Sequence, residues 1–171
     1  MDLQLSARLQ SHHWARRAPD WLAAGVAGFV AGAVLMTLEL AWAALSPDTS
    51  VWYGSHQVAA IALGRDALQS NAFSWGIVAT ALAIHYLLGI TFGLLLAAII
   101  APFHLDSSWH AVLSAGALFG AVLYGINFYG MSQVFGWFAE MRGAGTFCAH
   151  LVFGMVAAAA YRQLERPVAK R

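Results

Sequence analysis

An apolar stretch from Ser74 to Ala101 constrains the fold of this chain more than any other sequence feature. It can cross the hydrocarbon core of a bilayer as one helix, for which about 20 residues are enough. His85 lies near its middle, and Gly89 and Gly93 follow at intervals that place all three on one helix face. Small residues let another helix approach closely. The stretch therefore predicts a spanning helix whose histidine faces other helices.

The composition places the whole chain in the membrane class. Sixty per cent of its residues are hydrophobic and 10% are charged, whereas about a quarter of the residues of a soluble domain are charged. A net charge of +1 without a basic face gives no reason to expect nucleic acid as a partner. The single cysteine, Cys148, excludes an intramolecular disulfide and a multi-cysteine metal site.

Four apolar stretches are long enough to span a bilayer. They divide the chain into a polar N-terminal segment (1–19), a single membrane domain (20–161) and a basic tail (162–171), with spans over residues 20–45, 74–101, 109–137 and 144–161. Tryptophans stand near the ends of these spans, where indole rings settle at the headgroup level. The lipid bilayer is therefore the first expected partner.

Basic residues cluster outside the first and the fourth span. They are Arg8, Arg16, Arg17, Arg162, Arg166, Lys170 and Arg171, whereas the opposite loops contain only Arg65 and Arg142. Because cytoplasmic segments carry the excess of lysine and arginine, both termini are predicted to be cytoplasmic. The loop between the first two spans has helical spacing over residues 58–68, which predicts a short interfacial helix on the other surface.

An internal repeat organises the spans. Two pairs of segments are similar in sequence, residues 28–39 with 116–127 and residues 85–89 with 150–154. The alignment pairs Glu39 with Asn127 and His85 with His150. The predicted fold is therefore all-α, a four-transmembrane-helix bundle built from two tandem helical hairpins.

The aligned polar residues are expected at one depth in the membrane. Counted at about 1.5 Å per residue from the span centres, they lie within roughly 10 Å of the midplane on the non-cytoplasmic side. This predicted polar layer comprises Glu39, His85, Asn127 and His150, with Tyr86 and Tyr124 near enough in sequence to line it. The histidines outside the spans, among them His56, His104 and His110, are expected to be solvated.

The leading functional interpretation is a non-enzymatic membrane protein, a subunit or helix-bundle scaffold whose polar layer holds the helices together. Buried polar groups commonly join transmembrane helices. Several faces with glycines four residues apart motivate self-association or entry into a larger complex. An intramembrane carboxylate is nevertheless costly, which makes Glu39 the strongest functional candidate.

Two alternatives use the same residues. His85 and His150 could be the axial ligands of haem b, and with Glu39 they would form a two-histidine, one-carboxylate set for a transition metal. In the other alternative, Glu39 carries protons or ions in a small transporter or channel, with Asn127, Tyr86 and Tyr124 in the relay.

The chain resembles a family of small four-span inner-membrane proteins of proteobacteria, some of which carry the label sodium:proline symporter. The likeness covers most of residues 25–161 and is carried by VAAIALG (58–64), IHYLLGITFGLLLA (84–97), INFYGM (126–131), WFAE (137–140) and AHLVFG (149–154). It implies the same fold and a bacterial inner (plasma) membrane location. The family's motifs are tied to no demonstrated activity, so the resemblance leaves the function open.

Overall fold

The computed structural model describes residues 17–46 and 50–166, and every regular element in these ranges is helical. The first sixteen residues of the predicted 1–19 segment, and the predicted basic tail after Arg166, lie outside the described residues. Four helices are long and apolar enough to cross a membrane: α1 (Trp21–Leu45), α3 (Trp75–Phe103), α4 (Trp109–Gly125), which continues through irregular turns to Gln133, and α5 (Ala144–Leu164). This confirms the predicted four-span, all-α fold.

The helix ends follow from local sequence. Asp20 and Ser108 cap α1 and α4, because each side chain accepts a hydrogen bond from the backbone N–H three residues later. The second span was predicted to end at Ala101, but α3 includes Pro102 and ends at Phe103. Proline has a helix-compatible φ but lacks the N–H that the helix needs, and α3 ends one residue after it. His104, in the left-handed conformation (φ 52°), then ends the helix.

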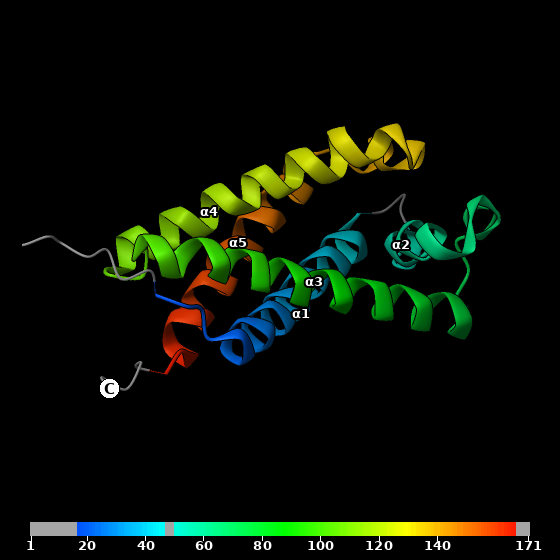
Figure 1. The fold of residues 1–171 in the computed structure, drawn as a ribbon. Coiled ribbons are helices and arrows are strands. Elements are labelled where there is room, and N and C mark those ends of the chain that lie inside the picture. The colour runs from blue at the N-terminus through cyan, green and yellow to red at the C-terminus, as the bar shows by residue number, and fades with distance from the viewer. Residues whose placement is uncertain (1–16, 47–49, 167–171) are drawn as a thin grey trace, which may run out of the picture.

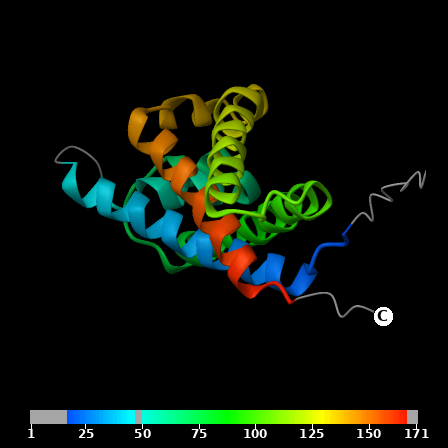
Figure 2. The same cartoon turned by 90° about the vertical axis from the view of Figure 1, so that its left-hand side faces the viewer.

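The long helices pack as two hairpins that meet through α1 and α5. α1 lies against α3, α4 lies against α5, and α1 also packs extensively on α5, whereas α3 makes few contacts with α4. Figure 1 shows α3 and α4 diverging from one end of the bundle, and Figure 2 shows the same helices from that end. The packing order is therefore α3, α1, α5, α4.

Equivalent glycines form the crossing in each hairpin. In the first, a Cβ added at Gly28 would lie 2.3 Å from the Gly89 carbonyl oxygen, and in the second, a Cβ at Gly116 would lie 2.4 Å from that of Gly154. The sequence repeat aligns the same two pairs, Gly28 with Gly116 and Gly89 with Gly154. The repeat is thus a repeat of packing, in which backbone touches backbone at matching positions.

This packing corrects the sequence-based argument for assembly. The glycine faces were expected to be exposed and available to another chain, but Gly28, Gly89, Gly116 and Gly154 are buried in contacts within the chain. A glycine face can serve only one close crossing at a time. The described glycine faces therefore stabilise the bundle itself and give no support for self-association.

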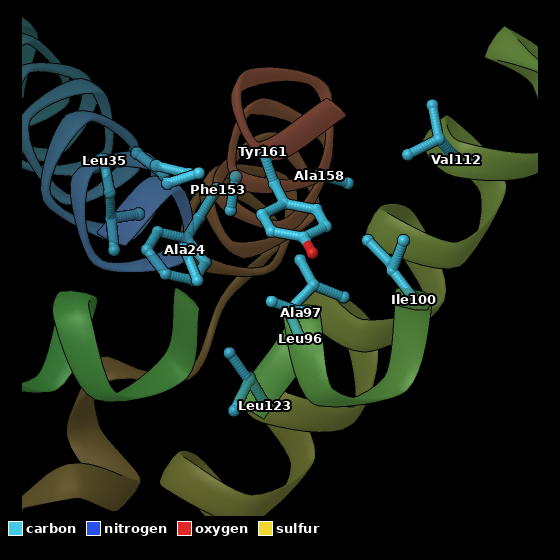
Figure 3. Close-up of a cluster of buried hydrophobic side chains, with 14 of the residues drawn as sticks. Ala24, Leu35, Leu96, Ala97, Ile100, Val112, Leu123, Phe153, Ala158 and Tyr161 are labelled. Atoms are coloured by element: carbon cyan, nitrogen blue, oxygen red, sulfur yellow. The ribbon is translucent and has the colours of Figure 1, made fainter. Parts of the chain in front are cut away.

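The main apolar core fills the end of the bundle where α1 and α4 begin and α3 and α5 end. Its largest fully buried side chains are Leu96, Ile100, Val112, Phe153 and Tyr161. Figure 3 shows these side chains converging from α3, α4 and α5, with alanines filling the close approaches. Alanine suits these places because its small side chain lets the helices come close.

At the other end of the bundle two connecting segments pack on each other. The predicted helix over 58–68 is instead α2 (Tyr53–Leu63), followed by a 3₁₀ turn, η1 (Arg65–Leu68), because Gly64 adopts a positive φ of 82°. Trp137, from the 3₁₀ segment η4 (Gly136–Met141), packs beside Ala60 and donates from Nε1 to the Gln57 carbonyl at 3.1 Å.

The third span ends differently from the prediction. A single stretch to Trp137 was expected, but α4 passes at Ile126 into a π-helical turn, η2 (Ile126–Gly130), and then a 3₁₀ turn, η3 (Met131–Gln133). The π turn contains Asn127, the polar residue that the repeat pairs with Glu39. π-helical turns are often found at functional sites, and here the turn carries the polar group of the second hairpin.

Candidate functional site

A cavity of about 280 Å³ lies between α1, α2 and α3. α1 and α3 supply its membrane-embedded walls, and α2 with the preceding turn closes it at the end of the bundle. Most of its lining is apolar, and the lining residues are Met36, Glu39, Leu40, Ala43, Val51, Trp52, Gly54, Ser55, Val58, Val78, Ala81, Leu82 and His85. An apolar cavity with a few polar groups is the usual form of a small-molecule site.

Among residues 17–46 and 50–166, Glu39 is the only acidic residue that lines this cavity. The carboxyl group is partly buried, and among the described residues it has neither a charged nor a hydrogen-bonding partner. Intramembrane carboxylates are normally paired, neutralised or functional. The structure thus places the strongest functional candidate from the sequence in a cavity with its acceptor oxygens unused.

His85 lines the same cavity from α3 and is oriented by the neighbouring helix. Its Nε2 lies 2.8 Å from the Gly32 carbonyl oxygen. A carbonyl oxygen can only accept, so Nε2 carries a proton, and in the neutral form of the ring Nδ1 is the acceptor nitrogen. The imidazole packs directly on this turn of α1, since a Cβ added at Gly32 would lie in van der Waals contact with Nε2, at 3.6 Å.

The equivalent residues of the second hairpin form a closed pair. His150 donates from Nδ1 to the Thr146 carbonyl oxygen at 2.9 Å, which leaves Nε2 to accept from the Asn127 side-chain amide at 3.4 Å. His150 is 5% exposed and lies against the rings of Phe128 and Tyr124. Both ring nitrogens of His150 are therefore satisfied within the protein.

The predicted polar layer is thus built as two pairs. Glu39 and His85 share the cavity, Asn127 and His150 share a hydrogen bond, and no hydrogen bond joins the pairs in the described part of the chain. The two tyrosines do not extend the cavity. Tyr86 stacks on Phe29, and the Tyr124 hydroxyl accepts from the Gly143 backbone N–H.

The haem and metal hypotheses gain no support from this arrangement. An axial or metal-bound histidine must present a free ring nitrogen. His85 keeps Nδ1 free, but both nitrogens of His150 are hydrogen-bonded, so the two rings do not present a matched pair of free nitrogens. Within residues 17–46 and 50–166, no three His, Cys, Asp or Glu side chains are close enough to hold a metal ion. Haem or metal binding by these residues therefore stays a prediction from the sequence.

His56 contradicts the expectation that histidines outside the spans are solvated. It is 4% exposed on α2, and its ring nitrogens lie 2.6 Å and 2.9 Å from the carbonyl oxygens of Ala67 and Ala72. This ring ties α2 to the segment that leads into α3. The helical spacing of His56 with the buried Ala59 and Ala60 was the available sequence signal. His104 and His110 are exposed, as predicted.

A charged cluster joins the chain ends to the α3–α4 turn. Arg17 donates to the Asp106 carboxylate and, at 2.9 Å, to Glu165. Burial alone would raise the pKa of Asp106, but hydrogen bonds from Glu165 and Arg17 hold that pKa below its ordinary value. Burial, reinforced by the hydrogen bond to Asp106, raises the pKa of Glu165 to about 7. One proton is therefore held by Glu165 and donated to ionised Asp106.

This cluster predicts a pH-dependent stability. The raised pKa of Glu165 makes a stabilising contribution that is complete below its ordinary value of 4.5 and is lost as the pH rises through about 7. We expect the unfolding temperature to fall between about pH 5 and pH 8, and Glu165→Gln, which keeps a donor but cannot titrate, to flatten that slope. Thermal unfolding in detergent at several pH values measures it. Exposed Glu140 supplies the control, Glu140→Gln; an unchanged slope in Glu165→Gln would contradict the assignment.

The fold defines a multi-pass helical membrane protein with a cavity between α1, α2 and α3. Comparison with known proteins adds no family, because no family model, no curated protein and no solved structure matches the chain.

Proposed function

We propose that this protein is a non-enzymatic membrane protein that binds a small ligand in the cavity between α1, α2 and α3. The main observation is that the Glu39 carboxyl group lines the cavity and has no partner among the residues that the structure describes. A group that served only to join helices would itself be joined to one. Glu39 instead keeps its hydrogen-bonding capacity for something that enters the cavity.

The second hairpin supports this interpretation as an internal control. It has the same glycine crossing and a histidine at the matching place, but Asn127 replaces the carboxylate and pairs with His150. In this packing arrangement, an uncharged amide is therefore enough to satisfy the histidine. A carboxylate at the equivalent place of the first hairpin is not needed for packing, so a binding role accounts for it.

The proposed orientation follows from charge and from the family resemblance. The basic residues near both ends of the chain favour cytoplasmic termini in a bacterial inner membrane. The described chain ends lie together, since the Arg166 backbone N–H donates to Asp20 at 3.3 Å. α2 and the cavity lie toward the other end of the bundle, so the ligand would enter from the outer half of the bilayer or from the periplasm.

Modification by a lipid-soluble carbodiimide tests this proposal. The acid form of a carboxyl group adds to dicyclohexylcarbodiimide, and the whole reagent stays on the protein as an N-acylurea. In lipid nanodiscs we expect one modification per chain, mapped by mass spectrometry to the peptide that contains Glu39. We expect Glu39→Gln to abolish it and Glu140→Gln, which removes an exposed carboxylate, to leave it unchanged.

Two results would overturn the binding proposal. Wild-type protein that is not modified at Glu39 while folded would show that the cavity does not admit a small hydrophobic molecule. Modification that proceeds equally in Glu39→Gln would place the reactive carboxyl group elsewhere, for instance at Glu165. Peptide mapping distinguishes these results from the expected one.

A further inference from the structure

We infer that the ligand of this cavity is a small organic ammonium ion that carries an apolar group; this inference rests on the proposed function and specifies its ligand class. The cavity combines a carboxyl group, a histidine whose donor nitrogen is already used, and an apolar aromatic wall. Each of these features limits which ligands can bind in the cavity.

The ionisable groups of the cavity offer acceptors. In its ionised form Glu39 can only accept hydrogen bonds. The Nε2–H of His85 is already donated to Gly32, which leaves Nδ1 as an acceptor in the neutral form of the ring. An occupant that satisfies both must bring N–H or O–H donors. A carboxylate or phosphate ligand would instead face the acceptors of Glu39 and His85 and would be rejected.

The charge of the cavity favours a cation over a neutral donor. No lysine or arginine is among the lining residues, so Glu39 has no fixed counter-charge there. An ion pair between a carboxylate and an ammonium group is strong where water is scarce, and its charge-assisted hydrogen bonds are about twice as strong as neutral ones. An ammonium ion would therefore bind more tightly than an alcohol of the same shape.

The size and lining of the cavity define the rest of the ligand. The cavity has a volume of about 280 Å³. Since one water molecule occupies about 30 Å³ in the liquid, the cavity has room for a ligand of roughly nine non-hydrogen atoms. Trp52 contributes an aromatic wall, and Met36, Val58 and Leu82 contribute aliphatic ones. Indole rings attract ammonium groups through their π faces and also pack against apolar groups. Benzylammonium has a suitable size and both chemical parts.

Isothermal titration calorimetry in lipid nanodiscs tests the inference with benzylammonium and benzyl alcohol, which have the same shape and differ in charge. We expect wild-type protein to bind benzylammonium at least about tenfold more tightly than benzyl alcohol, because the ammonium group adds a charge–charge attraction to the hydrogen bond that either compound can donate to Glu39. We expect Glu39→Gln to remove this preference and Glu140→Gln to keep it.

A second readout uses only wild-type protein, so it does not depend on how well a variant folds. Benzylammonium should slow the reaction of Glu39 with carbodiimide, and benzyl alcohol should protect less. Equal binding of the two compounds, or no binding of benzylammonium, would overturn the inference. If Glu39 still reacts with carbodiimide in that case, the proposed function stands and only the ligand class is wrong; if Glu39 does not react, the proposed function fails as well.

Discussion

Gly120→Ala is expected to destabilise the protein by about 3 kcal/mol, the upper end of the usual cost of overpacking. A Cβ at position 120 would lie 2.1 Å from the His150 carbonyl oxygen and 3.0 Å from the Leu151 Cα. Both obstructing atoms belong to the backbone of α5, so no side chain can rotate away. The new methyl group can be accommodated only if α4 and α5 separate, which would also pull His150 from Asn127. The midpoint of SDS-induced unfolding in mixed micelles measures this loss.

Gly125→Ala is the matched control for this change. It lies in the same helix, and a Cβ there meets nothing within 4 Å. We expect its unfolding midpoint to be unchanged or slightly higher, because alanine is the better helix former. Equal midpoints for Gly120→Ala and Gly125→Ala would show that the close crossing of α4 and α5 does not exist in the membrane.

Glu39→Gln and Asn127→Ala are expected to change stability in opposite directions, although the repeat places the two residues equivalently. Removing the Asn127 amide leaves the buried Nε2 of His150 without its donor and should cost about 1 kcal/mol. Replacing Glu39 by the uncharged glutamine removes an unpartnered carboxyl group from an apolar cavity and should raise stability by about 1 kcal/mol. Both shifts are measured by the same SDS titration.

The sign of the Glu39→Gln effect separates a binding role from a structural one. A residue retained for binding is free to weaken the fold, whereas a residue that joins helices must strengthen it. If Glu39→Gln lowered the unfolding midpoint as much as Asn127→Ala, Glu39 would be a packing residue and the proposed function would lose its main support. Asn127→Asp, which places a carboxylate in the closed pair, is expected to be destabilising in the same assay.

Much of the fold followed from sequence because the bilayer imposes simple rules. A stretch such as residues 74–101 must form a helix, since its backbone groups have no water to bind. The repeat predicted that the two hairpins are equivalent, and the structure places Gly28 on Gly89 and Gly116 on Gly154 at matching positions. The residues of the candidate site were likewise identified, since Glu39 and His85 are rare types within apolar spans.

Three features depended on contacts that the sequence does not encode locally. The passage of α4 into a π turn at Ile126 leaves no clear sequence signal. The burial of His56 depends on two carbonyl groups from a later segment. The division of the polar layer into an open and a closed pair depends on which helices meet and on where Asn127 is placed by the π turn.

The most direct test of the central claim, that only the first hairpin keeps an open polar site, is the rate at which carbodiimide modifies Glu39 in folded protein relative to protein unfolded in SDS. We predict modification of the folded protein in nanodiscs at Glu39, slowed by benzylammonium and absent in Glu39→Gln. Modification of Glu39 only after unfolding would contradict the claim, because it would show that the carboxyl group is sealed within the bundle.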